Sequence, residues 1–330
     1  MDAYFASVEE ISKPYLVNKP FIVSQLTKRA IVSTANYVAR KYGIKSAMPT
    51  YKAKQLCEEL IIVNPNYCLY EYYHDDIINF IKAKYTNNIE VVSIDECYID
   101  VTDLVHSKTE AYNLAKKIQN DIKTNIKLSC SIGISTTKFL AKMASKLQKP
   151  FGISTLYKNE VKDKIFSLPV GELFLLGKST AAMLKNNNIL YIKDIVEGDK
   201  KKLKSLLSNY NYFIDNLNAK GENALTYEES PAKSISNAYT FLNDTNDIDE
   251  IKSVIKYECR KIVSRMNETE KFKTISIRIK MDKERSYTRS ITITPTNSFD
   301  ELFANALFLF QNNFENKLIR LIGVAVSNFC

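Results

Sequence analysis

The stretch from Ile89 to Asp100 reads IEVVSIDECYID, with β-branched and aromatic residues on both sides of an acidic pair. Such residues favour strands, so we predict a β-hairpin with Asp95 and Glu96 at its tip. Two adjacent carboxylates repel each other, and leaving both ionised beside apolar strands costs free energy unless a cation compensates. Hard oxygen ligands select Mg²⁺ or Mn²⁺. Taken alone, an Asp-Glu pair in a turn is more often solvated surface charge than a metal site.

The segment after this hairpin predicts two helices and a strand. Ser107 to Glu110 reads SKTE, a capping box that begins a helix, and apolar residues recur after it at helical spacing. A strand from Leu128 to Ile134 and a helix from Thr137 to Leu147 come next. Strands that alternate with helices are typical of an α/β sheet domain.

The composition changes near Phe166. From there to about Ala219 the sequence is rich in lysine and has little strand signal, so we expect a small helical unit. Residues 221–232 lack apolar periodicity and include the helix-breaking Pro231. We predict a linker there.

The remainder predicts a split β-α-β sheet. Its expected strands are Ser234–Phe241, Phe272–Met281, Arg285–Thr294 and Ile319–Phe329, with one helix around Ile251–Ile262 and another after Ser298. In the second strand Ile275, Ile277 and Ile279 alternate with Thr274, Ser276, Arg278 and Lys280. One face of this sheet is therefore apolar, and the other offers hydroxyl and basic groups.

The bulk composition limits the function classes. The 330 residues carry a net charge of +9, which favours a polyanion such as nucleic acid, although a lysine-rich surface from an A+T-rich genome is an equal alternative. Six scattered cysteines without a C-x-x-C pair and only two histidines argue against zinc sites and disulfide frameworks. No apolar run is long enough for a membrane span, and no basic leader follows Met1. We expect a cytoplasmic protein.

Several motifs occur in a fixed order along the chain. They are DAYFASVEE at 2–10, STANYVARKYGI at 33–44, SIDE at 93–96, GISTTK at 133–138, KPFG at 149–152 and RLIGV at 320–324. Together they closely resemble the Y-family lesion-bypass DNA polymerases, and most of all the bacterial DinB and UmuC-like branch. The similarity covers essentially the whole chain.

The resemblance implies an α/β (α+β) multi-domain fold, the right-hand polymerase with palm, small fingers, helical thumb and split β-α-β little finger. The expected bounds are 1–3 and 67–156 for the palm, 4–66 for the fingers, 157–222 for the thumb, 223–232 for the linker and 233–330 for the little finger, also called the polymerase-associated domain.

The resemblance also implies catalytic roles. Asp95 would bridge two metal ions and Glu96 would ligate the catalytic one, with the Met1 backbone carbonyl and Asp2 nearby. Two Mg²⁺ ions, or Mn²⁺, would lower the pKa of the primer 3′-hydroxyl and neutralise charge on the leaving pyrophosphate.

Binding residues follow from the same resemblance. The nucleotide site would contain Ala3, Tyr4, Phe5, Thr34, Tyr37, Arg40 and Lys149, and DNA would contact Lys178, Arg278, Lys280 and Arg289. Phe5 takes the position of the steric gate, where an aromatic ring collides with a ribose 2′-hydroxyl. Without the resemblance Phe5 is a buried core aromatic, Tyr37 and Arg40 are one face of an ordinary helix, and Lys149 is a loop charge.

Three departures from the family pattern bear on function. The pattern places a third metal-binding Asp, preceded by an apolar strand, immediately before the position of Met1, so we expect that this sequence is an N-terminally truncated form of an active enzyme. Leu175 replaces the first glycine of an expected G-x-G in the thumb, which predicts an altered grip on a DNA phosphate. No C-terminal clamp-binding motif is seen, which leaves a sliding clamp open as a partner.

The predicted function is template-directed DNA synthesis of the translesion type, with primer-template DNA and dNTP as partners and no membrane. A catalytically impaired DNA-binding or regulatory relative is the alternative. A two-metal nuclease or phosphatase lacks the additional acidic and histidine ligands that we would expect.

Overall fold

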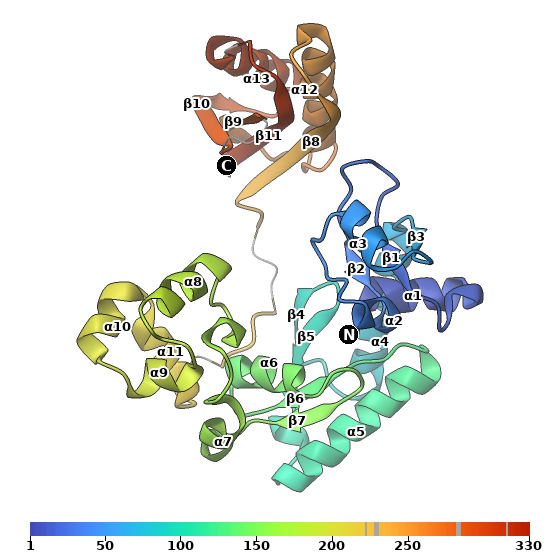
Figure 1. Ribbon diagram of the computed structural model, residues 1–330, viewed down its shortest axis with the longest axis vertical. Coiled ribbons are helices and arrows are strands. Elements are labelled where there is room, and N and C mark those ends of the chain that lie inside the picture. The colour runs from blue at the N-terminus through green and yellow to red at the C-terminus, as the bar shows by residue number, and fades with distance from the viewer. Residues whose placement is uncertain (222, 228–230, 282–284, 315) are drawn as a thin grey trace. The chain divides into compact units, whose positions relative to one another are not determined.

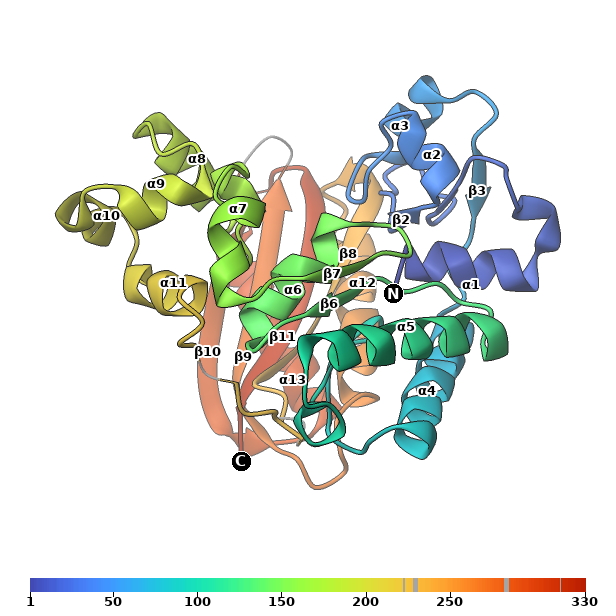
Figure 2. The ribbon, with the colours of Figure 1, turned by 90° about the horizontal axis from the view of Figure 1, so that it is seen from below.

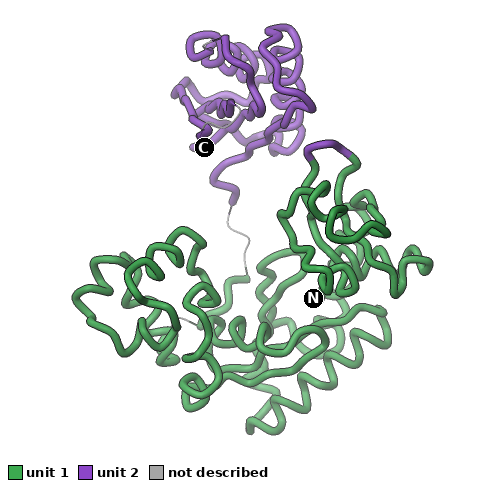
Figure 3. The backbone as a smooth tube through the Cα atoms, in the orientation of Figure 1, with its two compact units in different colours: residues 1–26, 30–228 green, residues 27–29, 229–330 purple. Residues whose placement is uncertain are grey.

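The computed structural model describes residues 1–221, 223–227, 231–281, 285–314 and 316–330. They form two compact units, residues 1–26 with 30–228 and residues 27–29 with 229–330 (Figure 3). The division lies in the predicted linker 223–232, of which residues 228–230 lie outside the described part. Among the described helices, none has the length and apolar character needed to cross a membrane.

The first unit begins with a helix and a small sheet. The elements are α1 (Tyr4–Ser12), β1 (Phe21–Val23), β2 (Thr34–Ala35), α2 (Tyr37–Lys41), α3 (Thr50–Leu56) and β3 (Ile61–Val63) (Figure 1). β1 is central, antiparallel to β2 and parallel to β3. Asn36 caps α2, because its Oδ1 accepts the N–H of Ala39 at 2.9 Å. This cap holds the start of α2 against the sheet.

The predicted hairpin and its helices follow. The elements are α4 (Tyr67–Lys84), β4 (Ile89–Ser93), β5 (Glu96–Ile99), α5 (Lys108–Asn125), β6 (Ile132–Ile134), α6 (Lys138–Leu147) and β7 (Ile153–Thr155). The hairpin is confirmed, with Asp95 in its turn and Glu96 as the first residue of β5. The predicted helix start at Ser107 is confirmed, since Ser107 Oγ accepts a hydrogen bond from the N–H of Glu110 at 3.2 Å. The reciprocal bond of the predicted capping box is shifted by one residue, because Oε2 of Glu110 accepts from the N–H of His106 at 2.8 Å.

The predicted α/β sheet is not continuous. The hairpin β4–β5 and the parallel pair β6–β7 are separate two-stranded sheets, and α5 and α6 pack against β6–β7 (Figure 2). The strand expected from Leu128 begins only at Ile132, where pairing with Ile153 starts. Before that point the backbone of Ser129 accepts the N–H of Asp2 at 3.0 Å. A strand needs a ladder partner along its length, and β7, which pairs with β6, begins only at Ile153.

A glycine is required where α6 crosses β6. A Cβ on Gly133 would lie 1.9 Å from the carbonyl oxygen of Ala141. Any larger residue would push α6 away from the strand.

Two hydrophobic cores group the elements of this unit. Tyr4 and Val8 of α1 share a core with Tyr70 and Ile77 of α4 and Ile118 of α5. Helix α1 therefore packs together with α4 and α5. Similarly, α6 shares its core with the helices that follow it.

Those helices are the predicted lysine-rich unit. They are α7 (Val161–Ile165), α8 (Lys178–Asn186), α9 (Ile192–Glu197), α10 (Lys200–Leu206) and α11 (Tyr210–Leu217). Leu175, which precedes α8, has a φ of +65° and is 59% exposed. An L-residue with a Cβ is strained in this left-handed region, which glycine adopts without that penalty.

The segment that follows α11 is attached to the hairpin. Glu90 of β4 accepts the ammonium of Lys138 at 2.8 Å and the N–H of Thr226 at 3.0 Å, and Lys138 also donates to the carbonyl of Ala224 at 2.8 Å. Burial alone would raise the pKa of Glu90, but these hydrogen bonds and the charge of Lys138 lower it below its usual value.

The second unit has the predicted order of elements. It contains β8 (Ser234–Thr245), α12 (Ile248–Val263), β9 (Phe272–Met281), β10 (Tyr287–Thr296), α13 (Phe299–Asn313) and β11 (Ile319–Phe329). The antiparallel sheet has the order β10-β9-β11-β8, and α12 and α13 pack on one face. Ile275, Ile277 and Ile279 are fully buried in that core, as their alternation predicted.

Replacing Leu175 with glycine should stabilise the first unit by about 0.5–1 kcal/mol, since relief of left-handed strain exceeds the added chain entropy. Urea unfolding of the full chain measures the change. Leu190→Gly is the matched control, at a similarly exposed leucine that does not have a positive φ. It should destabilise, and equal effects of both substitutions would contradict the strain argument.

Lys138→Met should lower the free energy of unfolding at pH 7 by about 0.5–1 kcal/mol. The pKa of Glu90 is lower in the folded than in the unfolded chain. The contribution of the Glu90–Lys138 pair to the free energy of unfolding is therefore complete above the unfolded-state pKa of Glu90, and it is lost as pH falls through the folded-state pKa. The difference between variant and wild type should therefore shrink below about pH 4. Urea unfolding across pH 3.5–7 tests this. Lys116→Met, on the exposed side of α5, is the control. A difference in free energy of unfolding between Lys138→Met and wild type that does not depend on pH would show that the Glu90–Lys138 pair is not its cause.

Candidate active site

Positively charged groups lie around Glu96 and around the backbone of Asp95. The backbone carbonyl of Asp95 accepts a hydrogen bond from the Met1 ammonium at 2.6 Å, and Oδ1 of Asp95 accepts one from the hydroxyl of Ser93 at 3.0 Å. Lys142 of α6 donates directly to Oε1 of Glu96. Lys149 adds a further positive charge close enough to affect Glu96. Glu96 is therefore not simply solvated surface charge.

Lys142 is a site residue that the sequence analysis missed. It lies one helical turn after Lys138, so both ammonium groups leave the same side of α6 and reach the hairpin. Burial alone would raise the pKa of Glu96, but the hydrogen bond and charge of Lys142 lower it below its usual value. The spacing of the two lysines was visible in the sequence, but their partner carboxylates were not.

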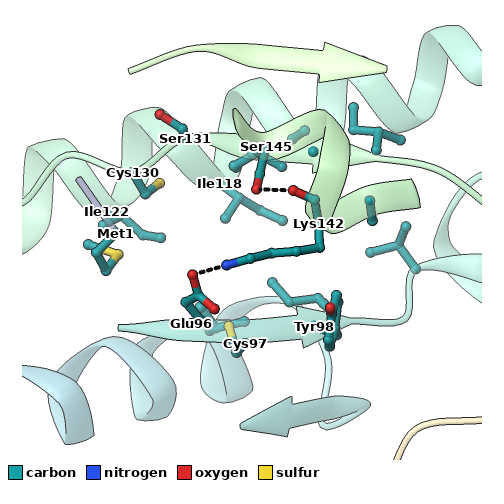
Figure 4. A pocket seen from close by; sticks show the side chains of 18 of the residues that line it. Met1, Glu96, Cys97, Tyr98, Ile118, Ile122, Cys130, Ser131, Lys142 and Ser145 are labelled. Carbon is teal, nitrogen blue, oxygen red and sulfur yellow. Dashed lines mark hydrogen bonds and ion pairs between the residues drawn. The ribbon is translucent and has the colours of Figure 1, made fainter. Parts of the chain in front are cut away.

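A cavity of about 220 Å³ lies between the hairpin and β6, with Glu96 on one side and Lys142 on the other (Figure 4). Ile118, Ile122 and Cys130 supply an apolar wall, and Met1 and Lys149 also line it. Charged groups bordering an apolar wall interact strongly, because little water screens them. Burial in this region raises the pKa of the Cys130 thiol to about 12.

Asp2 is turned away from the acidic pair. It is fully buried, its Oδ1 accepts the hydroxyl of Ser131 at 2.8 Å, and its Oδ2 accepts the N–H of Phe151 at 2.9 Å. Lys149 Nζ lies 3.8 Å from Oδ1. In the described part of the chain no group of three or more His, Cys, Asp and Glu side chains is placed to hold a metal ion. The structure does not bring Asp2 together with Asp95 and Glu96.

The predicted triphosphate residues lie at the start of α2 and after α6. Arg40 donates from Nε to the carbonyl of Ala35 at 2.9 Å, and its guanidinium lies 4.8 Å from the Tyr37 ring centroid. The Tyr37 hydroxyl is buried without a hydrogen-bond partner, and burial followed by the negative charge of Asp2 raises its pKa. Asp2 therefore lies close to both Tyr37 and Lys149. An unpartnered buried hydroxyl is costly unless a ligand completes it.

Of two further predicted nucleotide-binding residues, Thr34 is buried and Ala3 has a left-handed backbone conformation. Thr34 is buried in β2 beside Val23. Ala3 precedes α1 in the left-handed region with φ 44° and ψ 45°, and no side chain caps the helix there. Strained backbone of this kind is concentrated at functional sites, and free N–H groups at a helix start attract anions.

Phe5 lies in an aromatic cluster. Its ring stacks on Tyr70 with centroids 4.2 Å apart and an interplanar angle of 12°, and it meets Tyr67 edge-on at 6.1 Å. Tyr4 is buried and donates to the carbonyl of Tyr70 at 2.7 Å. Phe5 is only partly buried, so it is neither a free surface ring nor a core residue.

The predicted DNA contacts lie on different surfaces. Lys178 is the exposed first residue of α8. Arg278 and Lys280 lie on the β9 face opposite the buried isoleucines. Arg289 is paired with Ile277, and its Nε donates to Asn313 Oδ1 of α13 at 3.2 Å. The structure therefore does not bring Arg289 together with Arg278 and Lys280, because the register puts it on the helix side of the sheet.

Comparison with known proteins gives consistent matches. Residues 1–146 match the model of the impB/mucB/samB family, and residues 232–330 match that of the impB/mucB/samB family C-terminal domain. DNA polymerase IV of Ureaplasma parvum is 35% identical over 333 residues, which cover 99% of this chain and 92% of that protein. DNA polymerase IV 1 of Bacillus subtilis is 34% identical over 331 residues, covering 98% of this chain and 79% of that protein.

Solved structures agree with these matches. A Y-family DNA polymerase chimera of Dbh and Dpo4 has a TM-score of 0.88 at 28% identity and covers 99% of this chain and 96% of its own. An insertion ternary complex of Dbh DNA polymerase has a TM-score of 0.63 at 27% identity with the same coverage. The chain belongs to the impB/mucB/samB family and has the α/β right-hand fold of the DinB-like Y-family DNA polymerases.

Proposed function

We propose that this chain is a template-directed DNA polymerase of the translesion type, which transfers a deoxynucleoside monophosphate from a dNTP to a primer 3′-hydroxyl. The observation that carries the proposal is one cavity lined by the acidic residues Asp95 and Glu96 and by Lys142 and Lys149, with Lys142 bound to Glu96. Polyanionic substrates and a divalent cation both suit such a mixed site. Relatives named DNA polymerase IV support the substrate class.

The chain's own residues bind and orient the nucleotide. The guanidinium of Arg40 and the ammonium of Lys149 suit triphosphate oxygens, and the Tyr37 hydroxyl supplies a further donor. Burial keeps the pKa of Tyr37 raised, so this hydroxyl stays protonated at neutral pH. Ala3 and Tyr4 would offer backbone N–H groups at the start of α1.

Asp95 and Glu96 would hold Mg²⁺, with Mn²⁺ as a substitute. Their donor set fits one such ion, which typically takes one or two protein carboxylates together with substrate phosphates. A divalent cation would replace Lys142 as the counter-charge of Glu96. When bound, the ions of the two-metal scheme lower the pKa of the primer hydroxyl and neutralise charge on the pyrophosphate. The second ion would take its remaining oxygens from the substrate.

A catalytically impaired DNA-binding relative is the second candidate. It is favoured by the placement of Asp2, whose two carboxylate oxygens accept hydrogen bonds away from the acidic pair. Primer extension with Mg²⁺ separates the two candidates, since only the first predicts dNTP-dependent elongation.

The remaining partners and the compartment are part of the same proposal. Primer-template DNA would contact Lys178, Arg278 and Lys280, with Arg289 at the sheet edge. We also propose a cytoplasmic role in DNA repair, and binding to a sliding clamp is tested by co-elution of the two proteins.

Glu96→Ala should reduce primer extension at least about a hundredfold, because a charge-stabilising group of the transition state is lost. Binding of primer-template DNA, measured by fluorescence anisotropy, should stay within about twofold, because Glu96 contributes no attraction to phosphate. Asp100→Ala, at the other end of β5, is the control. A Glu96→Ala variant that extends primers at half the wild-type rate would remove Glu96 from catalysis.

Phe5→Ala should admit ribonucleotides, because the ring that would collide with the ribose 2′-hydroxyl is gone. Single-turnover incorporation of a dNTP and the matching rNTP should show the discrimination falling at least about tenfold. Phe80→Ala is the control, because it removes an aromatic ring from the C-terminal half of α4, away from Phe5. Unchanged sugar discrimination in Phe5→Ala would show that Phe5 is not the gate.

A further inference from the structure

Tyr70 of α4 contacts two residues that share one face of α1. Phe5 and Glu9 are four residues apart in that helix, so their side chains lie one above the other. The ring of Tyr70 stacks on Phe5 at 4.2 Å, and its hydroxyl donates to Oε1 of Glu9 at 2.6 Å. Tyr70 thus contacts α1 through both the face of its ring and its hydroxyl.

The attachment of Tyr70 is buried and leaves it little freedom. Tyr70 and Glu9 are both fully buried, and the second oxygen of Glu9 accepts the ammonium of Lys13 at 2.6 Å. The backbone of Tyr70 is held as well, because its carbonyl accepts the Tyr4 hydroxyl at 2.7 Å. A buried carboxylate with both oxygens satisfied keeps its geometry, since breaking either bond leaves charge unpaired.

The Tyr70 hydroxyl keeps its proton near neutral pH. Burial, followed by the hydrogen bond to Glu9, raises the pKa of Tyr70 well above its usual value. The phenol is therefore a permanent donor to Glu9.

Phe5, in contrast, is partly exposed, so its ring is less restricted by packing than the ring of Tyr70. Tyr67 meets the Phe5 ring edge-on but is itself 54% exposed, and Tyr4 meets it at 5.8 Å with the rings tilted by 48°. Among these ring contacts, the stack on Tyr70 is the closest and the one that lies along the face of the Phe5 ring. Stacked rings resist tilting, because the offset arrangement is the favourable one.

We propose that Tyr70, held in place by Glu9, is a positioning residue that fixes the Phe5 ring and so determines how strongly ribonucleotides are excluded. This inference rests on the proposed polymerase function, with Phe5 as the group that meets the sugar. A gate works only if its ring cannot move aside when a 2′-hydroxyl approaches. The Glu9–Tyr70 bond supplies that resistance from behind the site, without contact with the nucleotide.

The test is the ratio of incorporation efficiencies for a dNTP and the matching rNTP, measured by single-turnover primer extension with the full chain. The ratio within one preparation is independent of the fraction of active protein, so partial loss of folding does not obscure it. Tyr70→Leu removes the stack, Tyr70→Phe removes only the hydroxyl, and Glu9→Ala removes its acceptor. Tyr72→Leu is the matched control, on the same helix at a tyrosine that is 64% exposed.

Tyr70→Leu should lower the ratio about two- to tenfold, the range that loss of one aromatic stack implies. Tyr70→Phe and Glu9→Ala should each lower it by a smaller factor. The double variant Tyr70→Phe with Glu9→Ala should lower it no further than the stronger single variant, since both remove the same bond. Tyr72→Leu should leave it unchanged.

A ratio unchanged in Tyr70→Leu would overturn the inference while leaving the polymerase function intact. Equal losses in Tyr70→Leu and Tyr72→Leu would also overturn it, because the effect would then be a general one of α4. Absence of dNTP incorporation by the wild-type chain would overturn the proposed function, and this inference with it.

Discussion

The negative charge of Glu96 beside an apolar cavity is the constraint on which the site depends. A carboxylate at the border of an apolar wall is unfavourable unless positive charge lies close to it. Lys142 of α6 donates to Oε1 of Glu96, and Lys149 after α6 adds a second positive charge. The hairpin and the segment from α6 onward thus meet at one cavity.

The same residues show how the site would change when it is used. Lysine ammonium groups are mobile counter-charges on flexible stems, whereas a divalent ion requires fixed oxygen ligands. A site whose carboxylate is already neutralised by lysine avoids the cost of unpaired charge between catalytic cycles. A divalent ion held by Glu96 together with substrate phosphate would take the place of Lys142 with little change in net charge.

Local features of the fold were predictable from the sequence, and features that depend on distant partners were not. The hairpin and the helix after Ser107 follow from β-propensity and an N-cap serine, which act within a few residues. The strand before Ile132 was predicted too long, because its ladder partner is set by tertiary structure. The partners of Lys142 and Asp2 were hidden for the same reason.

The side of the sheet on which Arg289 lies was nevertheless readable in the sequence. Arg289 has the same parity as Ile291 and Ile293, whereas Arg278 and Lys280 alternate with buried isoleucines. A period of two therefore puts Arg289 on the apolar face, and the register of β9 and β10 agrees. Charge alone does not tell on which face of a strand a basic residue lies.

Helix α6 belongs to two structures at once. Phe139, Leu140 and Met143 pack into the core of the lysine-rich helices, while Lys138 and Lys142 on its other side bind Glu90 and Glu96. Because a helix moves as a rigid rod over this length, a tilt imposed at its apolar side displaces both ammonium groups together. A displacement in the core of the lysine-rich helices would therefore reach Glu90 and Glu96 through α6, which contacts its strand closely at Gly133.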